Sequence, residues 1–246
     1  MSERTDGGQY YPQQNPRYRI YGGSVYGEPP LKTLQAIRDI RNGGQVLEIG
    51  SGDGRVTIPM LREGYHVVAG ENDRRARRVL RGKCYIEDLR VITQIAFDTT
   101  KTPREILSSV RQRPRIKAIK MNALNSFPFE NGKFDGVVCT ALLHVFPEET
   151  IQRVVDESQR VLKPHGEGTI VFDLLTNRRV IRYDGSEERA ETPVSYTPSE
   201  GKKLIKSILS GKFSEPKIVD EDVDAYRAHL GHRLTAKRIT VSAQTT

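Results

Sequence analysis

Residues 46–54 have the sequence VLEIGSGDG, and no other segment constrains the fold as strongly. An apolar strand pattern ends there in a loop with glycines at positions 50, 52 and 54, and a helix pattern follows over residues 55–63. Glycine lets a backbone turn sharply and approach a ligand closely because it has no Cβ atom. In open α/β sheets, ligands bind at the carboxyl ends of the strands. The segment therefore predicts a strand–loop–helix unit with a nucleotide-like cofactor site.

The glycine spacing indicates which kind of cofactor the loop holds. It is Gly-x-Gly-x-Gly, whereas the dinucleotide fingerprint has one more residue before its third glycine. No Lys-Ser/Thr pair follows, which excludes a P-loop. A second predicted strand starts at residue 66 and ends at Glu71, where an acid can accept hydrogen bonds from both hydroxyls of a ribose. A ribose site without a pyrophosphate site favours an adenosine that carries something other than a phosphate chain.

Four segments in this order resemble the class I S-adenosylmethionine-dependent methyltransferases. They are residues 48–54, Glu71, residues 134–144 (FDGVVCTALLH) and residues 162–172 (LKPHGEGTIVF). The resemblance covers roughly residues 30–244 and implies S-adenosylmethionine as cofactor. It also implies a set of cofactor-binding residues, which comprises Glu48, Gly50, Ser51, Gly52, Gly54, Glu71, Asn122, Ala123 and Thr140.

The chain departs from the family pattern in two places. Glu48 stands where Asp is more usual, which keeps the carboxylate. After the third predicted strand the family often has an acid that contacts the adenine amino group, and here Asn122 and Ala123 follow. The side-chain oxygen of Asn122 can accept the same hydrogen bond, whereas Ala123 offers only its backbone.

Strands and helices alternate along the chain, which predicts an α/β fold with a parallel sheet flanked by helices. The expected strands span residues 45–50, 66–71, 116–122, 134–140, 168–175, 216–223 and 236–243. The expected helices span residues 30–41, 55–63, 73–82, 85–96, 103–112, 147–162 and 198–209. The resemblance implies a Rossmann-like sheet of seven strands with helices on both faces and an antiparallel final strand.

Within a methyltransferase domain of residues 30–246, two stretches exceed what this fold needs. Residues 85–112 are expected to form a helical insertion, and residues 176–196 an irregular loop on the substrate side. Residues 1–29 contain five tyrosines among many Pro, Gly, Gln and Asn residues. They form either a flexible leader or a lid that orders over the active site, in which Tyr18, Tyr21 and Tyr26 would contact the substrate.

A sulfonium methyl group is already electrophilic, so the enzyme must chiefly align a nucleophile and, where needed, remove a proton. His144 is the first candidate for a base and a substrate contact, because it follows the fourth predicted strand and titrates near neutrality. The alternative is that His144 packs against the next helix. Asp173, near the end of the fifth predicted strand, is a second catalytic candidate.

Charge and missing motifs bear on the methyl acceptor. The net charge is +8, and residues 74–120 hold fourteen Lys/Arg against four acids. That segment is either a solvated helix face or a patch for a polyanion. Neither the Asp/Asn-Pro-Pro-Tyr/Phe motif of amine methylation on adenine nor the Pro-Cys pair of cytosine methylation follows the fourth strand.

These observations favour methylation of N or O on a small molecule. An RNA or ribosomal methyltransferase and a non-catalytic S-adenosylmethionine-binding subunit stay open as alternatives. The two cysteines lack disulfide or zinc spacing, so no metal site is expected, and no apolar run is long enough for a membrane helix. A cytoplasmic protein is expected, and the sequence carries no signal for its oligomeric state.

Overall fold

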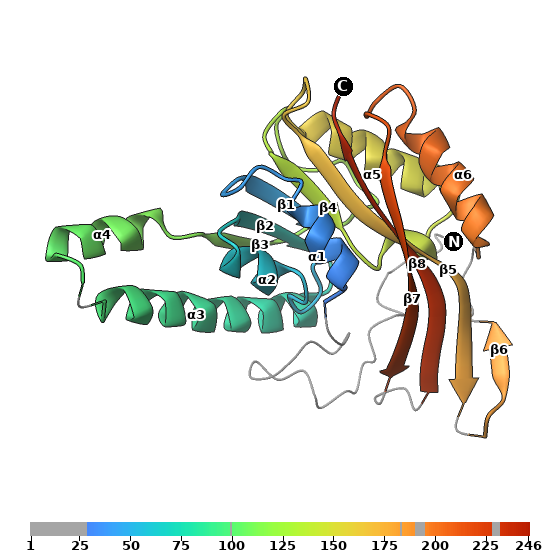
Figure 1. Ribbon diagram of the computed structural model, residues 1–246, viewed down its shortest axis with the longest axis horizontal. Helices are drawn as coiled ribbons and strands as arrows, with labels where there is room; N and C mark the ends of the chain where they lie inside the picture. The colour runs from blue at the N-terminus through green and yellow to red at the C-terminus, as the bar shows by residue number, and fades with distance from the viewer. Residues whose placement is uncertain (1–28, 99, 183, 190–194, 228–231) are drawn as a thin grey trace, which may run out of the picture.

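The computed structural model describes residues 29–98, 100–182, 184–189, 195–227 and 232–246. Its centre is one mixed sheet with the strand order β3-β2-β1-β4-β5-β8-β7, and β6 pairs with the outer part of β5 (Figure 1). The strands are β1 (Gln45–Ile49), β2 (His66–Glu71), β3 (Ile116–Lys120), β4 (Gly136–Cys139), β5 (Thr169–Arg182), β6 (Glu187–Arg189), β7 (Lys217–Arg227) and β8 (His232–Gln244).

Strands β1 to β5 run parallel, and β8 is antiparallel to both of its neighbours, β5 and β7. The predicted fold class is therefore confirmed: a mostly parallel Rossmann-like sheet with a reversed final strand. The helices are α1 (Leu31–Ile37), α2 (Thr57–Arg62), α3 (Arg74–Ala96), α4 (Pro103–Gln112), α5 (Glu148–Val161) and α6 (Pro198–Leu209), with a short 3-10 helix η2 (Leu143–Val145).

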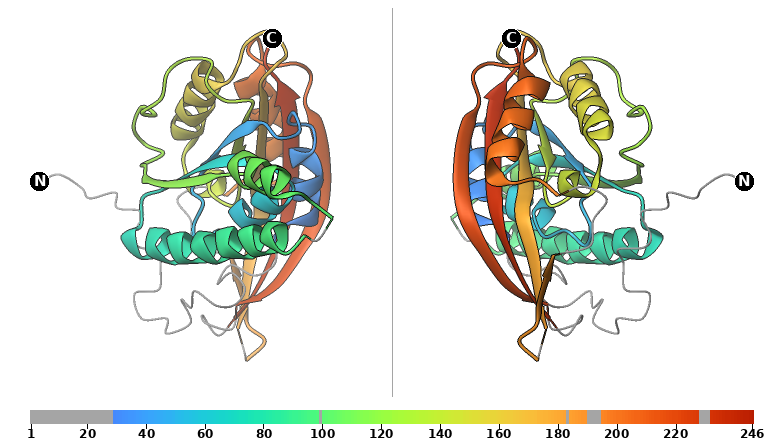
Figure 2. Two further views of the ribbon diagram at one scale, coloured as in Figure 1. Left: turned by 90° about the vertical axis from the view of Figure 1, so that its left-hand side faces the viewer. Right: turned by 90° about the vertical axis from the view of Figure 1, so that its right-hand side faces the viewer.

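The helices cover the two faces of the sheet and bury a separate apolar cluster on each (Figure 2). On one face, α1, α2 and the first half of α3 contribute side chains such as Ile37, Met60 and Leu80. On the other face, α5 and α6 contribute Val154 and Ile208, among others. A sheet covered in this way leaves its strand ends as the place where a ligand can reach the backbone.

Helix α3 is continuous from Arg74 to Ala96, so the predicted break between residues 82 and 85 is wrong. Gly82 lies inside this helix, although glycine weakens a helix interior. The helix continues because the residues that follow are anchored: Lys83 forms an ion pair with Asp53 at 3.1 Å, and Cys84 is buried. Local propensity is outweighed here by tertiary contacts.

Strand β5 continues to Arg182 and residues 187–189 form β6, so the prediction of an irregular loop over residues 176–196 is wrong for these two stretches. A register shift between Thr176 and Arg179, with Asn177 at φ +48°, interrupts the ladder with β8, which then resumes. Beyond this bulge, β5 pairs with β6 on one side and β8 on the other. The long strands form a ribbon that projects past the rest of the sheet (Figure 1).

Candidate functional site

The sheet register brings five strand ends to one edge. Ile49 at the end of β1 is level with Gly70 in β2 and with Cys139 at the end of β4. Cys139 in turn is level with Phe172 in β5, and Gly70 with Ile119 in β3. The residues that follow these positions therefore lie side by side, and they include most of the residues that the sequence singles out.

The loop after β1 is a tight turn that depends on its glycines. Gly50, Gly52 and Gly54 have φ values of +70°, +56° and +93°, in the left-handed region that side chains rarely adopt. A Cβ atom on Gly50 would lie 2.9 Å from Leu142 Cδ2 in the loop after β4. The backbone N–H groups of Gly50 and Ser51 both donate to the carbonyl oxygen of Gly70, at 2.9 and 3.1 Å. The loop is thus fixed against both neighbouring strand ends.

Glu71 connects the glycine loop to the end of β2. Its Oε2 accepts a hydrogen bond from the Gly52 N–H at 2.8 Å, and its Oε1 accepts one from the Asp73 N–H at 2.8 Å. The side chain is buried, and this burial raises the pKa of Glu71 even though both N–H groups oppose the shift. Each carboxylate oxygen can accept a further hydrogen bond. The carboxylate therefore retains acceptor capacity for the two hydroxyls of a ribose.

Two further buried carboxyl groups, Glu48 and Asp53, connect the loop to the helices that follow it. Glu48 is buried and accepts a hydrogen bond from the Thr57 hydroxyl in α2. Burial raises the pKa of Glu48 to about 8, against the smaller opposing effects of Thr57 and Arg55. Asp53, in the loop itself, forms a buried ion pair with Lys83 of α3. The sequence analysis missed this pair, since nothing in the spacing of residues 53 and 83 links them.

The segment after β3 carries the predicted adenine contacts. The Oδ1 atom of Asn122 accepts a hydrogen bond from the Leu124 N–H at 3.0 Å, which closes a local turn, and Ala123 packs against the core. This turn uses one of the two lone pairs of the Asn122 oxygen. An adenine contact by Asn122 stays a prediction.

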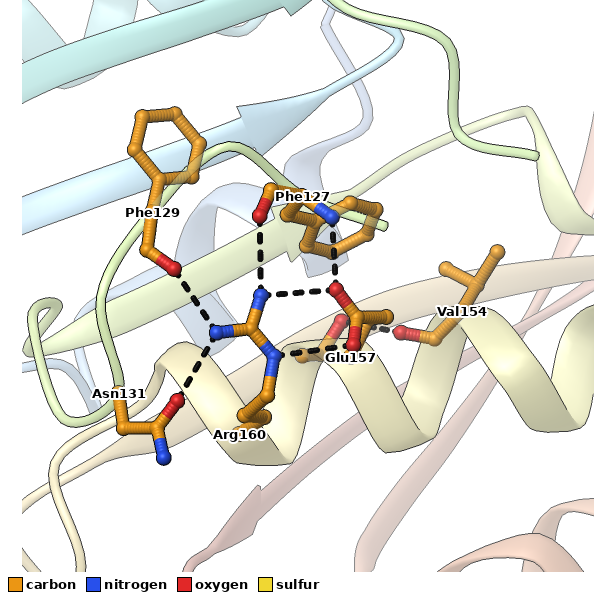
Figure 3. Close-up of polar contacts among 7 residues, drawn as sticks. Phe127, Phe129, Asn131, Val154, Glu157 and Arg160 are labelled. Atoms are coloured by element: carbon orange, nitrogen blue, oxygen red, sulfur yellow. Dashed lines mark hydrogen bonds and ion pairs between the residues drawn. The ribbon is translucent and has the colours of Figure 1, made fainter. Parts of the chain in front are cut away.

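Arg160 of α5 holds the chain that follows Asn122 in place (Figure 3). Its guanidinium group donates to the carbonyl oxygens of Phe127 and Phe129, to Asn131 Oδ1 and to both carboxylate oxygens of Glu157. Glu157 also accepts a hydrogen bond from the Phe127 N–H at 2.6 Å. All five N–H donors of the guanidinium are used, so the loop is fixed to α5 by a network rather than by a single contact.

The loop after β4 is shaped by Asp173 of β5. The Oδ1 atom of Asp173 accepts a hydrogen bond from the Ala141 N–H at 2.6 Å, and Ala141 has a φ of +52°. Thr140 is buried just before this turn, and His144 is buried just after it in η2. Asp173 thus sets the path of the chain between the two residues that the sequence placed at the cofactor and the substrate.

Asp173 is itself completely buried beside a cation. Arg238 of β8 approaches it to 3.2 Å and also forms an ion pair with Glu221 of β7 at 2.7 Å. Burial raises the pKa of Asp173, and the charge of Arg238 opposes the shift. These neighbours, which the sequence analysis missed, lie more than forty residues away along the chain. The predicted substrate contacts Tyr18, Tyr21 and Tyr26 lie outside the described residues.

Comparison with known proteins assigns the family. The model of a methyltransferase domain matches residues 47–170, which are 124 of the 246 residues. The chain belongs to the S-adenosylmethionine-dependent methyltransferases. The match spans the glycine loop, Glu71 and the loop after β4, and a comparison with curated proteins found no match. S-Adenosylmethionine is the cofactor of this methyltransferase, and the residues at the edge of the sheet fit it.

Solved structures share the fold at low sequence identity. A SAM-dependent methyltransferase from Methanosarcina mazei is 15% identical with a TM-score of 0.56, and the match covers 84% of this chain and 95% of the other. A second structure is 14% identical with a TM-score of 0.61, and the match covers 94% of this chain and 86% of the other. Its description is the conversion of a disulfide bond into a thioacetal group during echinomycin biosynthesis. TehB from Haemophilus influenzae is 15% identical with a TM-score of 0.55 and covers 87% and 62%, so this chain spans about three fifths of TehB.

Proposed function

We propose that this methyltransferase transfers a methyl group to a nitrogen or oxygen atom of a small molecule. S-Adenosylmethionine supplies an electrophilic methyl group on a sulfonium. Glu71 would accept hydrogen bonds from the ribose, and the loop of residues 50–54 would lie against the rest of the cofactor. The chain's remaining task is to align the acceptor and to remove its proton where it has one.

This choice of acceptor rests on one observation: many of the basic residues in 74–120 already have partners within this chain. Four of the fourteen form ion pairs with carboxylates of this chain: Lys83, Arg90, Lys101 and Arg113. Three more, Arg77, Arg81 and Arg115, donate to backbone carbonyl oxygens, which fixes their direction and leaves their charge. A cation that is already paired contributes less to phosphate binding, which depends on charge neutralisation and counterion release. This pairing favours the small-molecule acceptor over RNA.

We place His144 as the proton acceptor and Asp173 as a positioning residue. His144 lies in η2 directly after the turn that Asp173 holds through the Ala141 N–H. Because Asp173 is completely buried, it acts on the reaction through that turn and not by contact with the acceptor. His144→Gln is expected to lower kcat at least tenfold while the affinity for S-adenosylhomocysteine stays unchanged, and an unchanged kcat would remove His144 from this role.

Methyl transfer from labelled S-adenosylmethionine tests the acceptor class. Pools of small amines, phenols and carboxylates are compared with RNA, each at low and at high salt. We expect transfer to a small molecule with a rate that changes little with salt. Transfer to RNA that falls steeply with salt would contradict the proposal and favour the ribosomal alternative. Cofactor binding without transfer to any acceptor would favour the non-catalytic alternative.

A further inference from the structure

Helix α3 carries an exposed stripe along one face. Arg74, Arg78, Arg81, Tyr85 and Leu89 follow one another at intervals of four, three, four and four residues, which places them on the same side of the helix. All five side chains are exposed. The buried residues of α3 lie on the opposite side: Ala76, Val79, Leu80, Lys83 and Cys84. The stripe therefore begins with three cations and ends with two large apolar side chains.

The apolar end of the stripe belongs to a part of the chain that lacks a core. From residue 85 to residue 115, none of the described residues is buried. We call residues 85–112 the distal hairpin; it comprises the second half of α3 and the whole of α4, which Figure 1 shows projecting along the long axis of the molecule. Six large apolar side chains are exposed among the described residues, and four belong to this hairpin: Tyr85 (65% exposed), Leu89 (46%), Phe97 (79%) and Leu107 (58%). Exposed apolar side chains gathered in this way mark an interaction site.

The positive charge of the chain lies on both flanks of the distal hairpin. Residues 74–83 contain six Lys/Arg and residues 113–120 contain four, with no acid in either segment. The hairpin between them has four Lys/Arg and four acids, and the chain as a whole has a net charge of +8. The two flanks therefore carry +10, and the remainder of the chain is slightly negative. They also meet in space, because Arg81 donates to the carbonyl oxygen of Ala118 in the edge strand β3 at 3.2 Å.

Most of the cations on these flanks face solvent. Lys83 and Arg113 form ion pairs with Asp53 and Asp88. Seven of the ten are exposed: Arg74, Arg75, Arg78, Arg81, Arg115, Lys117 and Lys120. The hydrogen bond of Arg81 to a backbone carbonyl leaves its positive charge. The exposed apolar side chains of the hairpin are thus bordered by cations that can meet negative charge on a partner.

We propose that α3 and the distal hairpin dock on the surface of an anionic membrane. Arg74, Arg78 and Arg81 lie against lipid phosphates, while Tyr85, Leu89 and Phe97 enter the boundary between headgroups and acyl chains. Helices that bind at this boundary combine an apolar part with Lys/Arg, and each cation adds to the attraction of anionic lipids. RNA would engage the arginines but leave Leu89 and Phe97 in water. A second copy would bury the apolar side chains but bring like charges together.

Flotation of the full chain with lipid vesicles tests the proposal without a methyl acceptor, so its outcome is independent of the proposed reaction. We expect binding to vesicles of equal parts phosphatidylglycerol and phosphatidylcholine, no binding to phosphatidylcholine alone, and weaker binding at high salt. Arg74→Gln combined with Arg78→Gln is expected to lower the partition coefficient at least tenfold. Lys203→Gln combined with Lys206→Gln, which removes two exposed cations of α6, is the matched control and is expected to bind like the wild type.

The apolar part of the contact is tested separately. Leu89→Ser combined with Phe97→Ser keeps the charge of the chain and is expected to lower the partition coefficient at least tenfold, because apolar surface no longer leaves water. Leu31→Ser, which changes a 63% exposed side chain in α1, is the control and is expected to bind like the wild type. Circular dichroism checks that every variant stays folded.

Fluorescence locates the contact, because the chain contains no tryptophan. Phe97→Trp places a single reporter directly after α3. On anionic vesicles we expect its emission to shift to shorter wavelength and brominated lipid to quench it, whereas Leu31→Trp shows neither change.

A wild-type chain that does not bind anionic vesicles would overturn the proposal. Binding that survives both the arginine and the apolar substitutions would also overturn it, as would binding that leaves the emission of Phe97→Trp unchanged. Tight binding of RNA without binding to vesicles would assign the surface to nucleic acid instead. A mass that doubles with concentration in the absence of lipid, and returns to that of one chain in Leu89→Ser combined with Phe97→Ser, would assign the hairpin to a second copy.

Discussion

The glycine loop (residues 50–54) and the distal hairpin (residues 85–112) differ in burial, although α3 contacts the first and forms part of the second. Most of the loop is buried, whereas none of the described hairpin residues is. The first half of α3 supports the loop: Lys83 pairs with Asp53, and Leu80 lies 2.8 Å from where a Cβ on Gly54 would stand. The second half contacts α4, and Glu87 in it forms an ion pair with Arg62 of α2, but none of its described residues is buried. One helix thus packs into the core beside the glycine loop at its first half and exposes apolar side chains to solvent at its second half. Substitutions in the two regions should therefore differ sharply in effect.

The largest effect is expected from Gly52→Ala. Gly52 has a φ of +56° in the centre of the loop, and its N–H is held by Glu71. An added Cβ atom strains the backbone and stands where the cofactor is expected, so binding of S-adenosylhomocysteine should fall below detection in calorimetry. Gly43→Ala is the matched control, because Gly43 has a φ of +68° with nothing within 4 Å of its Cβ position. Equal affinities for the two variants would mean that the loop does not hold the cofactor.

The second largest effect is expected in the pH dependence of the free energy of unfolding, to which buried Glu48 contributes. Its folded-state pKa of about 8 lies above the ordinary value of 4.5, so the stability it contributes below pH 4.5 is lost as the pH rises to about 8. Glu48→Gln should thus gain stability relative to wild type across this window, by up to a few kcal/mol, since each pKa unit corresponds to about 1.4 kcal/mol. Urea unfolding at several pH values measures the difference.

Glu105 of the distal hairpin is the contrasting carboxylate for this experiment. Hydrogen bonds from Thr102 lower its pKa, and it is exposed to solvent. Glu105→Gln should show no change in relative stability between pH 5 and pH 8, because a lowered pKa acts only below that window. A flat profile for Glu48→Gln as well would show that the Glu48 carboxyl group is not desolvated in the folded protein.

Glu71→Ala should weaken S-adenosylhomocysteine binding by roughly 1.5–3 kcal/mol, the range for loss of a charged hydrogen-bond acceptor. Glu71→Gln sharpens this test, because its carbonyl oxygen can still accept the Gly52 N–H while the negative charge is gone. We expect Glu71→Gln to lie between wild type and Glu71→Ala. If both variants bind as tightly as wild type, the ribose is held elsewhere.

The smallest effect is expected in the hairpin. Leu107→Ala changes a side chain that is 58% exposed, so the free energy of unfolding of the monomer should change by less than about 0.5 kcal/mol. Leu80→Ala, in the supporting half of α3, removes a fully buried side chain and should cost about 2–5 kcal/mol. Thermal unfolding at low concentration compares them. Similar losses for the two variants would mean that the hairpin is packed against the body of the protein.

Much of the fold follows from local sequence, because the strands around the glycine loop are short apolar runs bounded by glycine, proline or charged residues. Strands β1 and β2 fall where the sequence predicts them, and α4 and α6 cover the predicted ranges 103–112 and 198–209, each after a capping box that begins at a threonine, Thr102 or Thr197. The continuation of β5 past Thr176 was not predictable, since it depends on pairing with β6 and β8 and not on alternation within residues 176–182.

The site was predictable as a set of positions but not as a set of contacts. The motif places Glu71 and the glycines at one edge, yet the hydrogen bond from Gly52 to Glu71 depends on how two strands are aligned. Asp173 was selected as a catalytic candidate, while its neighbour Ala141 comes from the loop after β4 and its neighbour Arg238 from β8. Burial of these charges is a property of the assembled sheet and leaves no local trace.

Calorimetric titration with S-adenosylhomocysteine, beside NAD and ATP and at low and high salt, tests the cofactor site most directly. We predict selective, salt-insensitive binding of S-adenosylhomocysteine that Gly52→Ala abolishes and Leu107→Ala leaves unchanged. Binding of NAD or ATP in preference, or binding that survives Gly52→Ala, would contradict a site built from the glycine loop and Glu71.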